Sequence, residues 1–283
     1  MKLAGIQYII SEDIDKNFEK MKNFIKIAVK ENAKIIAFPE LSLTKWFPAE
    51  IDDKNFKFAL TKNDKIFYEF SEIARENRVV LIIPFFEKDT KLKLYFNSCI
   101  LINSDGEIAG IYRKVHLPLI PYWEEKYYFK HGNLGFPVFD TEYGKIGIML
   151  GWDVFFPEVS RILTLNGAEI IIAPTASAFS SQPRWLSVIC ANALMNTVFI
   201  ARINRIGNEG KLEFYGGSFC CNPDGSLVSE PSGKGEGLVL WNINLDDLYE
   251  IRRLFPFLKD RIEKEYLKIC NIEFKTKRKK NVS

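Results

Sequence analysis

Short apolar runs alternate with amphipathic segments along most of the chain, and this alternation predicts the secondary structure. Residues 3–10 are apolar over the length of a strand and predict a buried strand. Ser11 follows this run and is expected to cap a helix. That helix has lysines between apolar residues that recur at the spacing of one helix face, namely Ile14, Phe18, Met21, Ile25 and Ala28. A second buried strand is predicted at residues 34–38.

The alternation continues to about residue 254. Further strands are predicted at residues 79–85, 96–102, 107–112, 169–173, 198–202, 214–221, 227–229 and 237–243. Helices are predicted at residues 64–77, 158–166, 185–196 and 246–254. Asn103-Ser104-Asp105-Gly106 and Asn222-Pro223-Asp224-Gly225 are hairpin-turn sequences. Because both hairpin and βαβ connections occur, the pattern predicts an α/β fold with two mixed sheets and helices outside them.

Composition restricts the class of protein. The chain has 283 residues, of which 47% are hydrophobic and 27% charged, as in globular proteins. Its 39 basic and 36 acidic residues give a net charge of +3, which predicts no nucleic-acid partner. The basic stretch at residues 275–280 is interpreted as a solvated terminus. The first apolar run is too short, and its flank too acidic, for a signal peptide or a membrane span, so a cytoplasmic location without membrane contact is expected.

The cysteines and histidines do not suggest a metal site. Two histidines occur, His116 and His131, and five cysteines are scattered without the paired spacing of zinc ligands. Cys220 and Cys221 are neighbours on a predicted strand, so their side chains are expected on opposite faces. We therefore expect neither a metal nor another cofactor, and we interpret the cysteines, Cys270 included, as small packing or surface residues.

The segment at residues 145–158 has the form of a nucleophile elbow. A buried apolar strand ends at a Gly-Trp-Asp corner, and Pro157-Glu158 then begins a helix. Such a turn lifts one side chain into an active site. Here the residue at the tip is Gly151, so the elbow presents no side chain there.

Two other polar residues follow predicted strands. Glu40 lies just beyond the buried run at residues 34–38, and Lys114 follows the run at residues 107–112. Active sites of α/β proteins gather beyond the carboxyl ends of strands. We therefore expect Glu40, Lys114 and the elbow at Gly151 to converge, although each residue alone is more typical of a solvated surface.

The order and context of these motifs resemble the nitrilase superfamily of carbon–nitrogen hydrolases. The similarity runs from Leu3 to about Arg261, and the branch that it resembles most is that of the N-carbamoylputrescine amidases. The segments that carry the superfamily resemblance are Ala37-Phe38-Pro39-Glu40, Tyr112-Arg113-Lys114-Val115-His116, Gly147-Ile148 through Trp152-Asp153, Phe156-Pro157-Glu158 and Asn204-Arg205-Ile206-Gly207. The segments that are similar to the branch are the aromatic stretch at residues 122–129 and Phe214-Tyr215-Gly216-Gly217-Ser218-Phe219. The resemblance implies a four-layer αββα sandwich, which we expect as one domain over residues 1–262 with a tail over residues 263–283.

The resemblance also implies roles for individual residues. Glu40 would act as general base, and Lys114 would stabilise the tetrahedral oxyanion with the backbone N–H of Trp152. Glu125 would orient the lysine and the substrate. The family's nucleophilic cysteine falls on Gly151. A small amide or N-carbamoyl compound is the implied ligand, with substrate-binding residues expected at Trp152, Asp153, Thr175 and Ala176.

Three explanations of Gly151 stay open at this point. The protein has lost hydrolysis and is a binding or regulatory protein, or water held by Glu40 attacks the substrate directly, or the glycine was introduced experimentally. A purely structural role is a further alternative. The resemblance implies a homodimer or larger homo-oligomer, formed through helices beside the elbow and a tail that crosses to a partner subunit. The aromatic residues of that tail are Phe255, Phe257 and Tyr266.

Overall fold

Two large β-sheets form the centre of the protein. The computed structural model describes residues 1–269, apart from the side chains of Ser180 and Gln182. The first sheet has the order β13 (Gly237–Asn242), β1 (Lys2–Gln7), β2 (Ala33–Ala37), β3 (Val80–Asp89), β4 (Leu94–Ile102) and β5 (Ile108–Arg113). The second has the order β12 (Phe219–Cys221), β9 (Phe199–Asn204), β8 (Ile170–Thr175), β7 (Gly144–Ile148) and β6 (Val138–Thr141). Each sheet contains parallel and antiparallel pairs, so both are mixed, as predicted.

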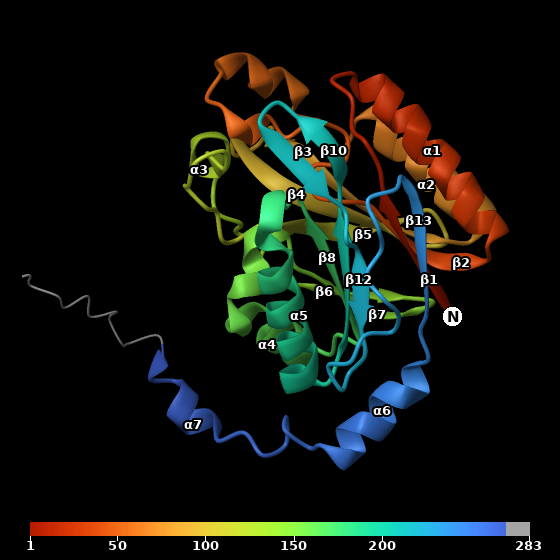
Figure 1. Ribbon diagram of the computed structural model, residues 1–283, viewed down its shortest axis with the longest axis vertical. Helices are drawn as coiled ribbons and strands as arrows, with labels where there is room; N and C mark the ends of the chain where they lie inside the picture. Colours follow the sequence, from red (N-terminus) through yellow and green to blue (C-terminus); the bar gives the residue numbers. More distant parts are fainter. Residues whose placement is uncertain (270–283) are drawn as a thin grey trace, which may run out of the picture.

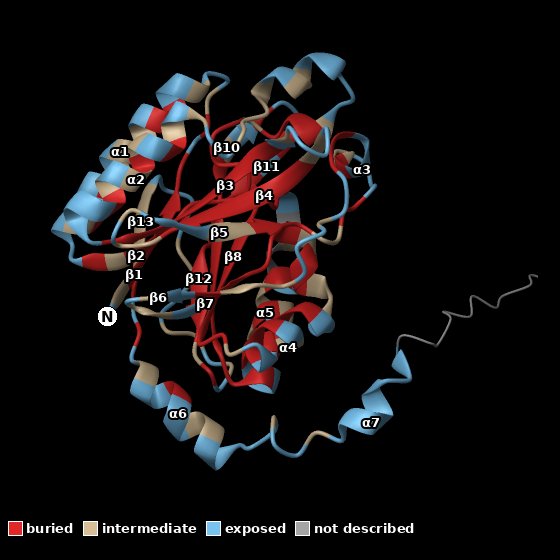
Figure 2. Ribbon diagram, turned by 180° about the vertical axis from the view of Figure 1, so that it is seen from behind, coloured by how far each residue is buried: buried red, intermediate tan, exposed pale blue. Residues whose placement is uncertain are grey.

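The sheets pack face to face, and each has helices on its outer side. Helices α1 (Ile14–Lys30) and α2 (Lys65–Asn77) lie side by side on one flank, while α4 (Pro157–Leu165) and α5 (Gln182–Asn196) lie on the other (Figure 1). The sheets between them are largely buried, and the helices expose their outer surfaces (Figure 2). This arrangement confirms the predicted four-layer αββα sandwich.

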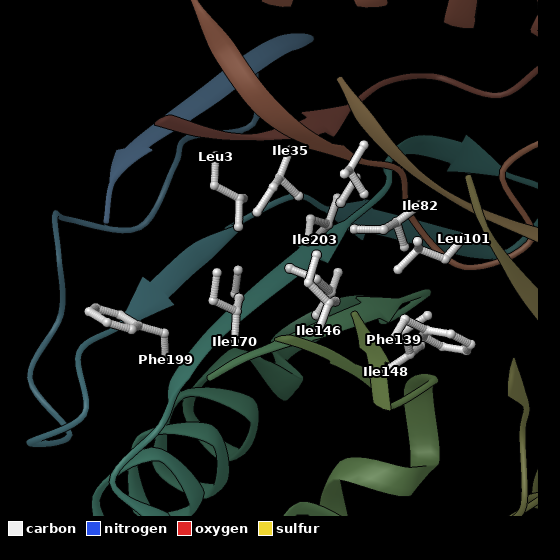
Figure 3. Close-up of a cluster of buried hydrophobic side chains, with 14 of the residues drawn as sticks. Leu3, Ile35, Ile82, Leu101, Phe139, Ile146, Ile148, Ile170, Phe199 and Ile203 are labelled. Carbon is white, nitrogen blue, oxygen red and sulfur yellow. The ribbon is translucent and has the colours of Figure 1, made fainter. Parts of the chain in front are cut away.

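Strand alternation explains why three apolar layers form. On β2, Ile35 points into the core between the sheets, while its neighbour Ile36 packs against the α1–α2 layer. Figure 3 shows the central layer, where Leu3 and Ile82 of one sheet face Ile170 of the other. The third layer packs α4 and α5 onto the second sheet. Since all three layers are continuous, the sandwich holds the strand ends in fixed positions.

The N-terminal helix begins differently from the prediction. The side chain of Asp13, not Ser11, caps α1 by accepting a hydrogen bond of 3.1 Å from the backbone N–H of Lys16. The Oγ of Ser11 instead contacts Asn17 Oδ1 at 3.0 Å. The buried face of the helix is otherwise as predicted, with Phe18, Met21, Ile25 and Ala28 in the core. Asp13 is the cap because the helix begins at Ile14, so Asp13 is the residue directly before the first turn.

The predicted strand at residues 214–221 is wrong as a continuous element. It consists of β11 (Leu212–Tyr215) and β12, separated by Gly216 and Gly217, which have φ values of +66° and +63°. Such backbone conformations end an extended strand. β11 pairs with β10 (Ile206–Glu209), a strand that the hydrophobic pattern did not reveal, in a separate two-stranded sheet. Likewise, the predicted strand at residues 227–229 is reduced to one bridge, between Cys221 and Leu227.

Other local predictions are confirmed. The turn at residues 103–106 joins β4 to β5, and Gly106 N–H donates to the carbonyl of Asn103 at 2.9 Å. Gly167 follows α4 with φ +100°, as expected of a residue that ends a helix. Cys220 and Cys221 point into different core layers.

Helix α5 begins at Gln182, three residues before its predicted start. No helix among residues 1–269 is long and apolar enough to span a membrane.

The C-terminal segment leaves the sandwich. Helix α6 (Leu245–Leu254) is anchored by buried Leu248 and by Arg252, whose guanidinium donates to two backbone carbonyls. Beyond it, residues 255–269 form an arm that includes α7 (Glu263–Tyr266) and extends away from the body (Figure 1). The arm exposes the apolar side chains of Phe255, Phe257, Ile262, Tyr266, Leu267 and Ile269. The predicted boundary at residue 262 stays a prediction, and the basic stretch at 275–280 and Cys270 lie outside the described residues.

Candidate active site

Four chain segments meet at one end of the sandwich. Glu40 follows β2, Lys114 follows β5, and Glu125 is the first residue of the short helix α3 (Glu125–Tyr128). Gly151 follows β7 and begins the 3-10 helix η3 (Gly151–Phe155). The carboxyl ends of β2 and β7 therefore bring together residues that are more than 100 positions apart in the sequence. The predicted convergence of Glu40, Lys114 and Gly151 is confirmed.

Lys114 is the centre of a buried charge cluster. Its Nζ lies 2.7 Å from Glu40 Oε1 and 2.7 Å from both carboxylate oxygens of Glu125. Asn97 on β4 donates from Nδ2 to Glu40 Oε1 at 2.8 Å. The exposed fraction of Lys114, Glu40 and Glu125 is at most 2%. Charges so deeply buried persist only when they are paired, so the contacts among Lys114, Glu40 and Glu125 are a structural part of the fold.

The cluster shifts the protonation of its members. Burial raises the pKa of Glu125 to about 7, despite the opposing attraction of Lys114. Burial alone lowers the pKa of Lys114, but the carboxylates of Glu125 and Glu40 outweigh it and raise that pKa above its ordinary value. Lys114 is therefore a permanent cation at neutral pH, whereas Glu125 is able to hold or release a proton there.

Gly151 lies directly against Glu40. A Cβ placed on Gly151 would be 2.5 Å from Glu40 Oε2 and 2.8 Å from Oε1. The backbone of Gly151 also has φ +46°, in the left-handed region that favours glycine. The Glu40 carboxylate thus occupies the space where a side chain at this elbow would begin. Its Oε2 also accepts a hydrogen bond of 3.1 Å from the backbone N–H of Ala176.

Asp153 fixes the elbow to the end of β5. Its Oδ2 accepts from the hydroxyl of Tyr112 at 2.7 Å and from the backbone N–H of Leu150 at 3.2 Å. Its Oδ1 accepts from the backbone N–H of His116 at 2.9 Å, and the ring of His116 stacks on Phe156 with centroids 3.6 Å apart. These contacts hold the backbone around Gly151, since the side chain of Asp153 is fully buried.

A cavity of about 340 Å³ opens beside the cluster. Glu40, Lys114, Glu125 and Gly151 line its buried end, with Ala176 and Ser177 beside them. Five aromatic side chains contribute to its walls, those of Trp123, Trp152, Phe155, Phe179 and Trp185. Such a hollow, with apolar walls and a few polar groups at one end, suits a small organic ligand.

The structure brings together six of the eight predicted site residues. Thr175 and Asp153 do not line the cavity. The hydroxyl of Thr175 donates to the carbonyl of Ile203 at 3.2 Å, and the carboxylate of Asp153 accepts from the hydroxyl of Tyr112 and from the backbone N–H of Leu150. Sequence reasoning missed Asn97, although a polar pair, Asn97-Ser98, interrupts an otherwise apolar run. It also missed Arg184, which lines the cavity from the first turn of α5. No group of three or more potential metal ligands is found within residues 1–269.

An αββα sandwich with a carboxylate–lysine–carboxylate cluster beside an elbow is the architecture that the sequence resemblance implied. Residues 2–253 match the family model described as carbon-nitrogen hydrolase. The chain therefore belongs to the carbon–nitrogen hydrolase family, within the nitrilase superfamily.

Individual relatives agree with this assignment. The chain is 33% identical to the N-carbamoylputrescine amidase of Arabidopsis thaliana, over 92% of this chain and 91% of the relative. It is 32% identical to the citrullinase of Francisella tularensis subsp. tularensis, over 92% and 95%. The crystal structure of a carbon-nitrogen hydrolase from Helicobacter pylori G27 superposes with a TM-score of 0.91 at 31% identity, covering 95% of this chain and 98% of that one.

Proposed function

We propose that the protein binds a small amide or N-carbamoyl compound in this cavity and that its hydrolysis of the bound compound is severely impaired. The observation that carries the proposal is the intact charge cluster beside an elbow whose tip, Gly151, has no side chain. The groups that would bind the compound are therefore present, whereas the side chain that would attack it is missing.

Each polar group at the buried end of the cavity suits one part of an amide. Lys114 is a cation able to donate a hydrogen bond to the carbonyl oxygen. The backbone N–H of Trp152, in the first turn of η3, is a second candidate donor, because such groups have no acceptor inside their own helix. The carboxylates of Glu40 and Glu125 accept hydrogen bonds from an amide NH₂ group. The names of the two relatives, which refer to carbamoyl and citrulline compounds, support this ligand class.

No other side chain replaces the nucleophile among the described residues. The cysteines in residues 1–269 are Cys99, Cys190, Cys220 and Cys221, and none of them lines the cavity. Ser177 and Ser181 also line it, but the Ser177 hydroxyl is hydrogen-bonded to Arg202 and Tyr215, and the Ser181 hydroxyl to the carbonyl of Ala178 and the indole N–H of Trp185. Loss of the nucleophile from a covalent hydrolase typically lowers turnover by about 10⁶-fold. Direct attack by water held at Glu40 would therefore be slow, and it is the second candidate activity.

Calorimetry tests the binding half of the proposal. The full chain is titrated with a panel of primary amides and N-carbamoyl amines, N-carbamoylputrescine among them. We expect saturable heat with at least one member and its loss in Lys114→Met, because that variant has no cationic donor for the carbonyl. Absence of heat with every member of the panel would refute the proposal.

Restoring the thiol tests the catalytic half. Gly151→Cys places a thiol beside Glu40, and we expect it to release ammonia from the compounds that bind, whereas the unmodified chain releases none above background. Gly151→Ala is the matched control, since it adds the same Cβ without the sulfur. Equal ammonia release by Gly151→Ala and Gly151→Cys, or efficient release by the unmodified chain, would contradict the assignment of Gly151 as the missing nucleophile position.

We also propose that the protein associates with copies of itself. Exposed apolar side chains are present on α4 and α5, beside the elbow, at Ile162, Leu165, Leu194 and Met195. The arm at residues 255–269 adds a second exposed apolar segment that extends away from its own sandwich. Association would remove both surfaces from water. A cytoplasmic location and the absence of a nucleic-acid partner stay predictions.

A further inference from the structure

Two cysteines from different parts of the chain meet outside the cavity. Cys190 lies on α5 and Cys221 ends β12, and their Sγ atoms are 3.2 Å apart. The two residues are 31 positions apart in the sequence, so the packing of α5 against the second sheet brings them together. Both are free thiols, and neither lines the cavity. The pair is therefore separate from the groups that would bind or hydrolyse an amide.

The packing around the pair places both sulfurs in one layer. Cys221 belongs to the core between the second sheet and its outer helices, and Cys190 packs against that core from α5. The backbone carbonyl of Cys190 lies 3.1 Å from the position that a Cβ on Gly225 would occupy, in the turn that follows β12. Because Gly225 has no side chain and φ +82°, this turn approaches the helix closely. The close approach holds Cys190 beside the strand that carries Cys221.

The two members of the pair differ in their access to solvent. Cys190 is half-buried, whereas Cys221 is buried, and burial raises the pKa of the Cys221 thiol. The other cysteines among residues 1–269, Cys99 and Cys220, lie in the core between the two sheets, where burial also raises the pKa of their thiols. Thiols that stay protonated and buried react poorly with oxidants. Cys190 is therefore the thiol that a small oxidant reaches first.

We propose that Cys190 and Cys221 form a reversible disulfide when the protein meets hydrogen peroxide. The Cys190 sulfur attacks one peroxide oxygen, the O–O bond breaks, and Cys190 becomes a sulfenic acid while one water leaves. The Cys221 thiol then attacks the Cys190 sulfur, so that the S–S bond forms, the S–O bond breaks, and the hydroxyl group leaves with the thiol proton as a second water. The two thiols thus lose two electrons and two protons, and the peroxide takes up both.

The structure requires little movement for this step. A disulfide joins its sulfurs at about 2.05 Å, so the Sγ atoms must approach by about 1.2 Å from their present 3.2 Å. The new bond would join α5 to β12 and close a loop of 31 positions, which restricts the unfolded chain and stabilises the folded one. For a domain of this size, we expect the oxidised form to have a Tm about 5–10 °C above that of the reduced form.

The test compares reduced and peroxide-treated protein. It uses the full chain with Cys270→Ala, because Cys270 lies outside the described residues and would add a fifth thiol. After brief treatment with a small excess of hydrogen peroxide, titration of the denatured protein should show that two of the four thiols are lost. Peptide mapping should join the peptide of Cys190 to that of Cys221. Dithiothreitol should restore both thiols and return Tm to its reduced value.

Variants assign the disulfide to this pair. Cys190→Ala and Cys221→Ala each leave one partner, so neither should form a disulfide within the chain or gain Tm with peroxide. Cys220→Ala is the matched control, because Cys220 adjoins Cys221 in sequence but points into the other core layer. It should lose two thiols and gain as much in Tm as the parent chain. Since Cys190 is half-buried, Cys190→Ala gives the comparison even where the loss of buried Cys221 prevents folding.

Several outcomes would overturn the proposal. All four thiols could survive the peroxide, or the disulfide could join a different pair or two copies of the chain. Oxidation of Cys190 to a sulfinic acid with the Cys221 thiol intact would also exclude the second step. An oxidised chain that melts no higher than the reduced chain would refute the stabilising link between α5 and β12. These results are independent of amide binding, which calorimetry tests separately.

Discussion

Replacing Gly151 with alanine tests the geometry at the centre of the site. The new Cβ would lie 2.5 Å from Glu40 Oε2, whereas an ordinary contact begins at 3.4 Å. The carboxylate oxygen must therefore move by about 0.9 Å, the difference between these two distances. Oε2 accepts the hydrogen bond from Ala176, and Oε1 those from Lys114 and Asn97, so the movement disturbs a bonded group.

Two costs add in this variant. Alanine in the left-handed conformation costs about 1–2 kcal/mol. Losing one charge-assisted hydrogen bond at the buried carboxylate costs about 1.5–3 kcal/mol. We therefore expect Gly151→Ala to lower the free energy of unfolding by about 2.5–5 kcal/mol. Gly135→Ala is the matched control, since Gly135 has φ +67° and nothing within 4 Å of its Cβ position, so that only the backbone cost applies.

The assay is thermal unfolding of the three chains under one set of conditions. For a domain of this size, each kcal/mol lowers Tm by about 2–4 °C, so Gly151→Ala should melt about 3–12 °C below Gly135→Ala. Equal Tm values for the two variants would show that Glu40 does not occupy the space beside Gly151. Stability of Gly151→Ala equal to that of the unmodified chain would refute the positive φ as well.

Three further predictions concern the cluster and the arm. Lys114→Met leaves two buried carboxylates without a counter-charge. We expect it to lower the free energy of unfolding in urea by about 3–5 kcal/mol at pH 7.5, and by less at pH 5, where the carboxylates accept protons. Equal losses at both pH values would contradict this. Burial raises the pKa of Glu125 from 4.5 to about 7, so the folded state binds a proton more tightly than the unfolded state and stability falls as pH rises between these values. Glu125→Gln should remove that decline, which is worth about 3 kcal/mol. A difference in stability between the variant and the unmodified chain that stays constant with pH would count against this. Truncation after Leu254 removes the exposed arm and should reduce the oligomeric size in size-exclusion chromatography; an unchanged size would exclude the arm from the interface.

Local pattern was sufficient to predict most of the sandwich. The alternation of Ile35 and Ile36 between two core layers follows from strand geometry, which places successive side chains on opposite faces. The helical spacing of Phe18 and Met21 defined the buried face of α1 in the same way. Errors occurred where the local signal was ambiguous, as at residues 214–221, where apolar residues on both sides of Gly216 suggested one strand.

The sequence by itself determined the two sheets, the elbow and the positions of Glu40, Lys114 and Gly151 at the ends of strands, because hydrophobic periodicity and turn chemistry act over a few residues. The tertiary structure alone decided what these residues touch. The Glu40 carboxylate reaches Ala176, 136 positions away, and fills the space beside Gly151. Arg202 lacks the acidic partner that Arg205 has, although both lie on the same short segment. Such contacts depend on how two sheets pack against each other, and the packing joins residues whose separation in the sequence carries no local signal.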